Sequence, residues 1–311
     1  MDTHVLEVHN LIKNYGSYTA VDDISFSVKK GEVVGFLGPN GAGKTTTIQI
    51  LLGITLATSG EISYFNKDFK KYKQETLQRI NYASAFNTLQ GRITVYENLM
   101  VFAKLYGVKK PKEKIMELIT YFDSASLLKE TYWGLSAGQK TRVNIIKALL
   151  NDPELILMDE PTASLDPDVA DKTLSLIENL KKERNISLLF TSHNMDEITR
   201  ICDRVIFLDK GKIVAEDSPL NLTKRSGKAT LRLAFDGKKE DMEHYLKTHK
   251  QEYTFINKFI VSISTDEKII PKLIFGISKT DLYITDIEVK KPTLEDFFLH
   301  IAREKGKTDH A

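Results

Sequence analysis

Short apolar runs alternate with longer amphipathic stretches from the N-terminus to about residue 216. Four of these runs read EVVGFLG, LILMDE, ISLLFTSH and RVIFLD, and each is bounded by polar residues or glycine. Such runs are typical of strands that are buried on both faces of a parallel sheet. Because helical patterns separate them, this part of the chain is predicted to form an α/β fold, a parallel sheet with crossover helices.

The pattern changes after the polar segment SPLNLTKRSGKA, residues 218–229. From there we expect strand TLRLAF, helix KEDMEHYLKTH, strands EYTFIN and FIVSIS, helix KIIPKLIFGISK and strand LYITDIEV. The order βαββαβ is that of a ferredoxin-like domain. Pro271 falls in the first turn of its helix, where proline is tolerated. Thr293 and Asp296 have the spacing of a capping box for one further helix.

Length and composition agree with this division. A chain of 311 residues has room for a large α/β domain over 1–220 and a small α+β accessory domain over 221–311. With 41% hydrophobic and 28% charged residues, it has the composition of a soluble globular protein. The net charge of +2 gives no case for a nucleic-acid partner. The single cysteine, Cys202, excludes an internal disulfide and fits a reducing compartment.

Neither a signal peptide nor a membrane span is expected. The N-terminal stretch MDTHVLEVHNLIKNYG lacks the apolar core of a signal peptide. The longest apolar run, IQILLGITLA, falls well short of the roughly 20 residues that a membrane-spanning helix needs. We therefore expect a cytoplasmic protein, in which any membrane role requires a partner.

The clearest chemical motif follows the first of the apolar strands. It has the pattern G-x-x-x-x-G-K-T and consists of Gly38, Pro39, Asn40, Gly41, Ala42, Gly43, Lys44 and Thr45, followed by Thr46. In such a loop the glycines let backbone N–H groups turn toward phosphates, and the start of the next helix adds its positive end. Lys44 then reaches the β- and γ-phosphates, and the Thr45 hydroxyl ligates Mg²⁺. The motif predicts nucleotide binding but does not distinguish kinases, GTPases and transport ATPases.

Two later motifs make that distinction. The segment LSAGQ, residues 135–139, precedes LILMDEPTASLDP, residues 155–167. Together they resemble the core of the ATP-binding cassette (ABC) family, with Ala137 where that family most often has glycine. The resemblance covers residues 4–217. It implies a RecA-like parallel sheet, an antiparallel β subdomain, a helical subdomain at about 85–150, and ATP hydrolysis coupled to transport.

The residues around the strand LILMDE fit this chemistry. Asp159, at the end of the strand, can hold Mg²⁺ through water, and Glu160 can polarise the attacking water as general base. His193 follows the strand ISLLF, and the resemblance implies a contact with the γ-phosphate, although a lone histidine is more often structural. Ser164 to Asp166 resemble the family's D-loop. Asp166 and Pro167 also have the pattern of a helix N-cap and first-turn proline.

Two further sites are expected to contact nucleotide. Ser136, Gly138 and Gln139 lie at the start of an amphipathic helix, where backbone N–H groups form a second anion site. Because the first loop already binds phosphates, this site is expected to serve the ATP of a second cassette, and the resemblance implies a head-to-tail homodimer. An ordinary capped helix is the alternative, although it leaves Gly138 and Gln139 without a role. Tyr15 matches the family's adenine-stacking aromatic residue; Tyr18 lies nearby, and a surface tyrosine in a turn is the alternative.

One expected residue is missing. Where the family commonly reads IGYLPQ, this chain reads INYASA, and alignment on Ile80 and Tyr82 puts Ala85 at the glutamine position. Gln90 lies five residues further on. Either Ala85 weakens catalysis, or the loop is remodelled so that Gln90 or water takes over. Because the phosphate, metal and base residues are all present, we favour a working ATPase with an atypical coupling loop.

The C-terminal segment PTLEDFFLHIA resembles the ending of drug- and lipid-exporter cassettes. The resemblance implies an ATPase subunit that uses ATP and Mg²⁺ and works on integral-membrane permease subunits, at the inner face of the cell membrane. An importer ATPase and a nucleotide-binding regulatory or immunity subunit with little turnover are the alternatives. A cassette acting on ribosomes or DNA is not expected, because such proteins carry two cassettes or a long coiled-coil insertion.

Overall fold

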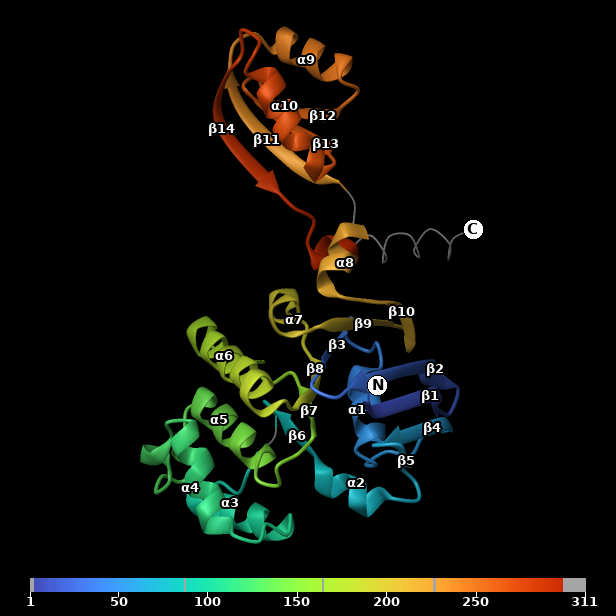
Figure 1. The fold of residues 1–311 in the computed structure, drawn as a ribbon, viewed down its shortest axis with the longest axis vertical. Coiled ribbons are helices and arrows are strands. Elements are labelled where there is room, and N and C mark those ends of the chain that lie inside the picture. Colours follow the sequence, from blue (N-terminus) through green and yellow to red (C-terminus); the bar gives the residue numbers. More distant parts are fainter. Residues whose placement is uncertain (1–2, 87, 164, 226–227, 299–311) are drawn as a thin grey trace. The chain divides into compact units, whose positions relative to one another are not determined.

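The computed structural model describes residues 3–86, 88–163, 165–225 and 228–298. The chain divides into two compact units, the first ending at Pro219 and the second beginning at Leu220. Figure 1 shows the elements of each unit. Helix α8 (Pro219–Arg225) begins at the division.

The first unit contains two sheets. The antiparallel sheet has the order β2-β1-β4-β5, with β1 (His4–Tyr15), β2 (Tyr18–Lys29), β4 (Ser59–Tyr64) and β5 (Lys67–Asp68). The six-stranded sheet has the order β10-β9-β3-β8-β7-β6, with β3 (Val33–Leu37), β6 (Ile80–Ser84), β7 (Leu155–Asp159), β8 (Ser187–Thr191), β9 (Arg204–Asp209) and β10 (Lys212–Asp217). The four apolar runs singled out in the sequence thus form β3, β7, β8 and β9, and the predicted α/β fold is confirmed.

One strand departs from the predicted parallel sheet. β10 pairs with β9 in antiparallel fashion. Lys210 and Gly211, which join the two strands, have positive φ angles of 48° and 80°. Such a two-residue turn reverses the chain in a hairpin, so the second strand cannot be parallel to the first.

Three helices of the first unit, α3, α4 and α5, form a group. Figure 1 shows α3, α4 and α5 together on one side of the unit, with the antiparallel sheet on the other. The helices are α1 (Lys44–Leu51), α2 (Lys73–Arg79), α3 (Val95–Leu105), α4 (Pro111–Tyr121), α5 (Ala137–Ala148), α6 (Pro167–Arg184) and α7 (Met195–Ile201), with short 3₁₀ turns at Ala125–Leu127 and Tyr132–Gly134. The start of α3 has a complete capping box, in which Thr94 and Glu97 satisfy each other's backbone N–H groups.

The main core lies between the two sheets and encloses α1. Apolar residues of β1 and β2 pack there against Ile48 and Leu51 of α1 and against inward residues of β3, β7, β8 and β9. Phe26 and Phe36 meet edge to face across this core, with ring centres 4.9 Å apart. The phosphate-binding motif that precedes α1 is therefore held by a helix whose sides are buried.

Cys202 is the residue that follows the last turn of α7, and its side chain packs against the six-stranded sheet. Its sulfur lies so near Gly35 of β3 that a Cβ built on that glycine would come within 2.7 Å of it. Burial raises the pKa of the Cys202 thiol far above its ordinary range. This cysteine is a packing residue.

The second unit is an α+β domain. Its strands are β11 (Ala229–Asp236), β12 (Glu252–Asn257), β13 (Ile260–Thr265) and β14 (Tyr283–Lys290), with helices α9 (Lys239–Thr248) and α10 (Ile270–Ile277). The sheet order β12-β13-β11-β14 is antiparallel throughout. Together with the chain order βαββαβ, this is the ferredoxin-like topology that the sequence predicted.

The details of this unit also match the sequence pattern. Pro271 lies in the first turn of α10. Thr293 and Asp296 form the expected capping box, since the Asp296 carboxylate accepts from the Thr293 N–H at 2.9 Å and the Thr293 hydroxyl accepts from the Asp296 N–H at 3.2 Å. The helix they begin is described through residue 298, and the rest of its predicted length lies outside the described residues.

We predict that replacing Ile263 by alanine destabilises the second unit by about 2–5 kcal/mol, because its side chain is fully buried in the core of that unit. Ile256 on the neighbouring strand is 54% exposed, so Ile256→Ala should change stability by less than about 0.5 kcal/mol. Urea unfolding with hydrogen exchange on peptides from 229–290 measures both. Equal losses for the two variants would contradict the assigned core.

Candidate functional site

The site begins with four strand ends at one level of the parallel sheet. Phe36 of β3 is paired with Thr191 of β8, Thr191 with Asp159 of β7, and Asp159 with Ser84 of β6. Because parallel strands present their carboxyl ends at the same edge, the loops that follow them meet there. The phosphate-binding motif, Glu160, His193 and Ala85 all follow these ends directly.

The phosphate-binding motif has the backbone that the sequence predicted. Gly43 precedes α1 with φ at 101°, and a Cβ there would come within 2.5 Å of the Ala20 carbonyl oxygen. Only glycine fits this conformation in this space. The Nζ of Lys44 donates to the carbonyl oxygens of Gly38 at 2.6 Å and Pro39 at 3.1 Å. Burial lowers the pKa of Lys44, and the nearby charges of Glu160 and Asp159 oppose that shift.

A pocket of about 210 Å³ lies over this motif. It is lined by Tyr15, Tyr18, Ala20, Asn40, Gly41, Ala42, Gly43, Lys44, Thr45, Thr46 and Glu160. Most of the residues predicted for one nucleotide are thus brought together. Lys13 Nζ lies 4.6 Å from the ring centre of Tyr15, and the Tyr18 hydroxyl donates to the Gly41 carbonyl at 3.5 Å. Both tyrosines face the pocket, so position alone does not choose between them.

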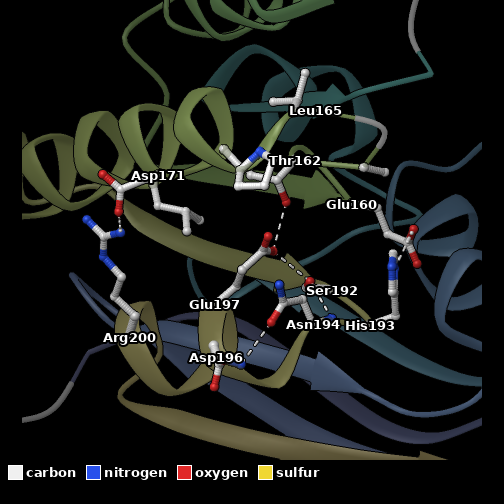
Figure 2. Close-up of a pocket in the computed structure, with 14 residues that line it drawn as sticks. Glu160, Thr162, Leu165, Asp171, Ser192, His193, Asn194, Asp196, Glu197 and Arg200 are labelled. Carbon is white, nitrogen blue, oxygen red and sulfur yellow. Dashed lines mark hydrogen bonds and ion pairs between the residues drawn. The ribbon is translucent and has the colours of Figure 1, made fainter.

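Glu160 and His193 form a pair at the same edge of the sheet. Figure 2 shows their side chains turned toward each other, with Nδ1 of His193 3.2 Å from Oε2 of Glu160. Glu160 has a positive φ of 47°, which is uncommon for a residue with a side chain. Its carboxylate is largely shielded, whereas the imidazole is mostly exposed.

Thr191 holds the side chain of Asp159 and the backbone of Glu160, and the sequence analysis did not identify it. Its hydroxyl donates to Oδ1 of Asp159 at 2.6 Å and accepts from the Glu160 N–H at 3.0 Å. Its carbonyl accepts from the same N–H at 3.1 Å. The only signal was a threonine at the end of an apolar strand, two residues before His193, and nothing in the sequence pairs that position with Asp159.

The start of α5 is a capping box. Ser136 Oγ accepts from the Gln139 N–H at 3.3 Å, and Gln139 Oε1 accepts from the Ser136 N–H at 2.9 Å. A Cβ on Gly138 would overlap Cγ1 of Val169 in α6. The expectation that a capped helix leaves Gly138 and Gln139 without a role is therefore wrong, because capping uses Gln139 and close packing on α6 requires Gly138. These residues do not line the pocket over the phosphate-binding motif.

The start of α6 confirms half of its predicted pattern. Asp166 is the N-cap residue by its backbone and Pro167 occupies the first turn, but the Asp166 side chain makes no capping hydrogen bond. Ser164, the first residue of the predicted D-loop, lies outside the described residues.

Ala85 comes immediately after the strand end that faces Asp159. Ser84 is the partner of Asp159 in the sheet, and its hydroxyl accepts from the Phe86 N–H at 3.2 Å. Gln90 is held elsewhere, since its N–H donates to Asn98 Oδ1 of α3 at 3.0 Å and its carbonyl accepts from Asn98 Nδ2 at 2.9 Å. The backbone positions thus favour Ala85, rather than Gln90, as the residue at the glutamine position.

β6, which leads to Ala85, is also tied to the helical region by a buried lysine. Lys147 of α5 donates from Nζ to the Tyr82 carbonyl at 2.8 Å. Burial lowers the pKa of Lys147 to about 8. The helix that carries LSAGQ and the strand that leads to Ala85 therefore share a polar contact inside the core.

The donor set suits Mg²⁺. Thr45 supplies a hydroxyl and Asp159 a carboxylate, and oxygen ligands are those that Mg²⁺ prefers. Among the described residues, no three His, Cys, Asp or Glu side chains lie close enough to hold a metal ion by themselves. Mg²⁺ commonly uses one or two protein oxygens and completes its shell with substrate phosphates and water, so these two residues fit a nucleotide-bound ion.

Comparison with known proteins identifies the family. The linearmycin resistance ATP-binding protein of Bacillus subtilis is 32% identical over 305 residues, which cover 96% of this chain and 98% of that protein. The chain belongs to the ABC transporter ATP-binding proteins. The family described as "ABC transporter" matches residues 21–163 of this cassette protein. The bacitracin transport ATP-binding protein of Bacillus licheniformis is 33% identical, with 96% of this chain and 97% of that protein covered.

Solved cassettes share the fold of the first part of the chain. The cbiO1 protein of Clostridium perfringens, part of the transporter complex cbiONQ, matches with a TM-score of 0.65 and 27% identity over 72% of this chain and 92% of that one. The ADP conformation of the ATP-binding cassette MJ1267 matches with a TM-score of 0.62 and 27% identity over 69% and 91%. The cassette is thus an ATP-binding and ATP-hydrolysing transporter subunit, as its motifs predicted.

The cassette shows no candidate membrane span in residues 3–86, 88–163, 165–225 and 228–298, where every helix is too short or too polar to cross a bilayer.

We predict that Gly138→Ala destabilises the cassette by about 1–3 kcal/mol, because its methyl group would overlap Val169. Adding Val169→Ala in the same chain removes the overlap and should restore most of the lost stability. Thermal unfolding of the two single variants and the double variant measures this. If the double variant remains as unstable as Gly138→Ala, contact with Val169 is not what requires glycine.

Proposed function

We propose that this chain is the ATPase subunit of an exporter, in which two copies enclose two ATP molecules and drive separate membrane subunits. The observation that carries the proposal is the Glu160–His193 pair, 3.2 Å apart, at the sheet edge that also carries the phosphate-binding motif. Glu160 lines the pocket over that motif, so its carboxylate faces the space where a nucleotide's phosphates would lie.

The residues around that pocket are assigned complementary roles. Tyr15 stacks on adenine, and the backbone N–H groups of residues 38–46 bind the phosphates. Lys44, now bonded to two carbonyls of its own loop, turns to the β- and γ-phosphates when ATP binds. Thr45 and Asp159 are the residues that would hold Mg²⁺, which when bound would neutralise charge on the phosphates.

Hydrolysis then uses Glu160 and His193. Glu160 accepts a proton from a water molecule whose oxygen attacks the γ-phosphorus, and the bond from that phosphorus to the β,γ-bridging oxygen breaks. The products are ADP and inorganic phosphate. His193 lies beside Glu160 and contacts the γ-phosphate. Thr191 keeps Asp159 and the backbone of Glu160 in register throughout, through the hydrogen bonds described above.

A second copy completes the nucleotide site. Ser136, Gly138 and Gln139 stand at the start of a helix outside the pocket over the phosphate-binding motif, and the backbone N–H groups of a helix start attract anions. Since capping and packing explain the residue types without nucleotide, this role rests on the family resemblance and on the position of the helix start. The Asp166 side chain at the start of α6, which makes no capping hydrogen bond, is assigned a contact with the second copy.

Export is favoured over import by the relatives that span nearly the whole chain. Two of them are named for linearmycin resistance and for bacitracin transport, and both coverages include the second unit. Another, named Nod factor export ATP-binding protein I of Rhizobium sp., is 30% identical over 99% of this chain. We infer that the cassette binds an integral-membrane permease at the inner face of the cell membrane.

A regulatory or immunity subunit with little turnover is the competing hypothesis. A subunit of that kind would have the same nucleotide-binding residues, and only Ala85 at the glutamine position favours this hypothesis. The intact arrangement of Lys44, Asp159, Glu160 and Thr191 argues against it, because a chain without turnover has no need to keep the base and metal positions in register. Measurement of turnover separates the two.

We predict that Glu160→Gln lowers ATP turnover by about 100-fold or more, because it removes the general base while keeping the side chain's shape. ATP binding should persist, and the variant should accumulate as an ATP-bound dimer. Phosphate release and size-exclusion chromatography with ATP and Mg²⁺ measure both effects. The control is Glu113→Gln, an exposed carboxylate on α4 that pairs only with Lys110 in the described structure.

Absence of Mg²⁺-dependent turnover in the unmodified chain, alone and with its membrane partner, would reject the ATPase proposal in favour of the regulatory one. A Glu160→Gln variant that stays monomeric with ATP would reject the two-cassette arrangement.

We predict that Ala85→Gln leaves the affinity for ATP within about twofold and changes turnover by roughly fivefold, the worth of about one hydrogen bond made in the transition state. The matched variant is Gln90→Ala, since Gln90 is exposed and its backbone is fixed to Asn98 of α3. It should have little effect. If Gln90→Ala abolishes turnover while Ala85→Gln does nothing, the loop uses Gln90 instead.

A further inference from the structure

Glu197 is a buried carboxylate that the roles assigned so far leave unused. It lies in the first turn of α7, and only 6% of the residue is exposed. Burying a carboxylate is costly unless hydrogen bonds compensate for the lost water. What Glu197 is bonded to therefore indicates why it is there.

A single oxygen of Glu197 joins two loops of the site. Oε2 accepts from the Thr162 hydroxyl at 2.7 Å and from the Ser192 hydroxyl at 2.7 Å. Figure 2 shows the three side chains meeting at this oxygen. Thr162 and Ser192 are themselves buried, with 6% and 3% exposure. The two hydrogen bonds are thus short and shielded from water.

These two partners flank the catalytic pair. Thr162 follows Glu160 by two residues on the loop after β7, and Ser192 immediately precedes His193 on the loop after β8. Since Glu197 belongs to α7, its carboxylate connects the two loops without contacting either member of the pair. The residues that it binds are two positions from Glu160 and one position from His193 in the sequence.

Both hydroxyls have a fixed orientation. A hydroxyl has one proton to donate, and in Thr162 and Ser192 that proton points to Glu197. Ser192 Oγ also accepts from the Asn194 N–H at 3.0 Å. The same oxygen therefore stabilises the turn that carries His193. An acceptor is required at position 197, because both partners donate.

The backbone at Glu160 needs such support. Its φ of 47° belongs to a sparsely populated region, which persists only when surrounding contacts hold it. Thr191 fixes the Glu160 N–H, and the Ala163 N–H donates back to the Glu160 carbonyl at 3.1 Å. The hydrogen bond from Thr162 to Glu197 anchors the middle of that turn to α7.

We propose that Glu197 is a positioning residue for ATP hydrolysis, which sets the separation of Glu160 and His193 by holding Thr162 and Ser192 on one carboxylate oxygen. The inference rests on the catalytic roles proposed above for Glu160 and His193. It assigns Glu197 no contact with ATP, so its removal acts on turnover and not on affinity.

The test compares the purified full-length chain with Glu197→Ala. A misplaced base is expected to lower kcat by about 10- to 100-fold, since small errors of position at the reacting atoms have effects of this size. The Kd for ATP should stay within about threefold. Hydrogen exchange in ATP-free protein should speed up in peptides covering 160–163 and 191–195. Asp196→Asn is the matched control, because its exposed carboxylate neighbours Glu197 on the same turn.

Two further variants separate positioning from stability. Glu197→Gln keeps an oxygen with two lone pairs, so its kcat should stay within roughly fivefold of that of the unmodified chain. The triple variant Glu197→Met, Thr162→Val and Ser192→Ala removes the carboxylate and both hydroxyls together, which is close to neutral for stability. The N–H of the exposed residue Asn194 loses its acceptor in this variant and is expected to bond to water. It should melt near the unmodified chain and still turn over about as slowly as Glu197→Ala.

Several results would overturn the proposal. One is a folded Glu197→Ala chain with normal kcat, and another is a triple variant that recovers turnover along with stability. A loss of kcat that follows the unfolded fraction, or a Glu197→Gln variant as slow as Glu197→Ala, would also do so. If the unmodified chain has no turnover either alone or with its membrane partner, the proposed ATPase role fails; if it turns over normally and Glu197→Ala does too, only the positioning role fails.

Discussion

Parallel hydrogen bonding between β3, β8, β7 and β6 is the constraint on which the whole site depends. It puts Phe36, Thr191, Asp159 and Ser84 at one level, so four loops that are far apart in the sequence begin side by side. A shift of one residue in any of these registers would turn a side chain to the other face of the sheet. The antiparallel strand β10 lies at the opposite edge from β6 and leaves this arrangement unaffected.

Hydroxyl groups hold the carboxylates and loops at this edge of the sheet in place. Thr191 holds Asp159 and Glu160, while Thr162 and Ser192 converge on Glu197. A hydroxyl donates one directed hydrogen bond and adds no charge. The carboxylates of Asp159 and Glu197 are oriented in this way by groups that bring no charge of their own. In the proposed mechanism, these contacts fix Asp159 as a metal ligand and the backbone that carries Glu160 as the base.

What could be predicted from the sequence was local in origin. The phosphate-binding loop, the capping box of Thr293 and Asp296, and the βαββαβ order all follow from neighbouring residues and their spacing. The missed features depend on long-range contacts: Gly138 is required by Val169 of another helix, and Glu197 meets Thr162 from 35 residues away. Asp166 shows the opposite limit, because a correct N-cap position did not imply a capping hydrogen bond.

The packing of Cys202 has a practical consequence. It is the only cysteine among 311 residues, and its sulfur is buried against Gly35 with a pKa raised far above neutral pH. A thiol in that state reacts slowly with alkylating reagents. Any cysteine introduced on the surface would therefore be the single reactive thiol of the protein. Spin labels or fluorophores could be placed on each unit of the native sequence without first removing a background cysteine, and the separation of the two units could be followed through a cycle of ATP binding and hydrolysis.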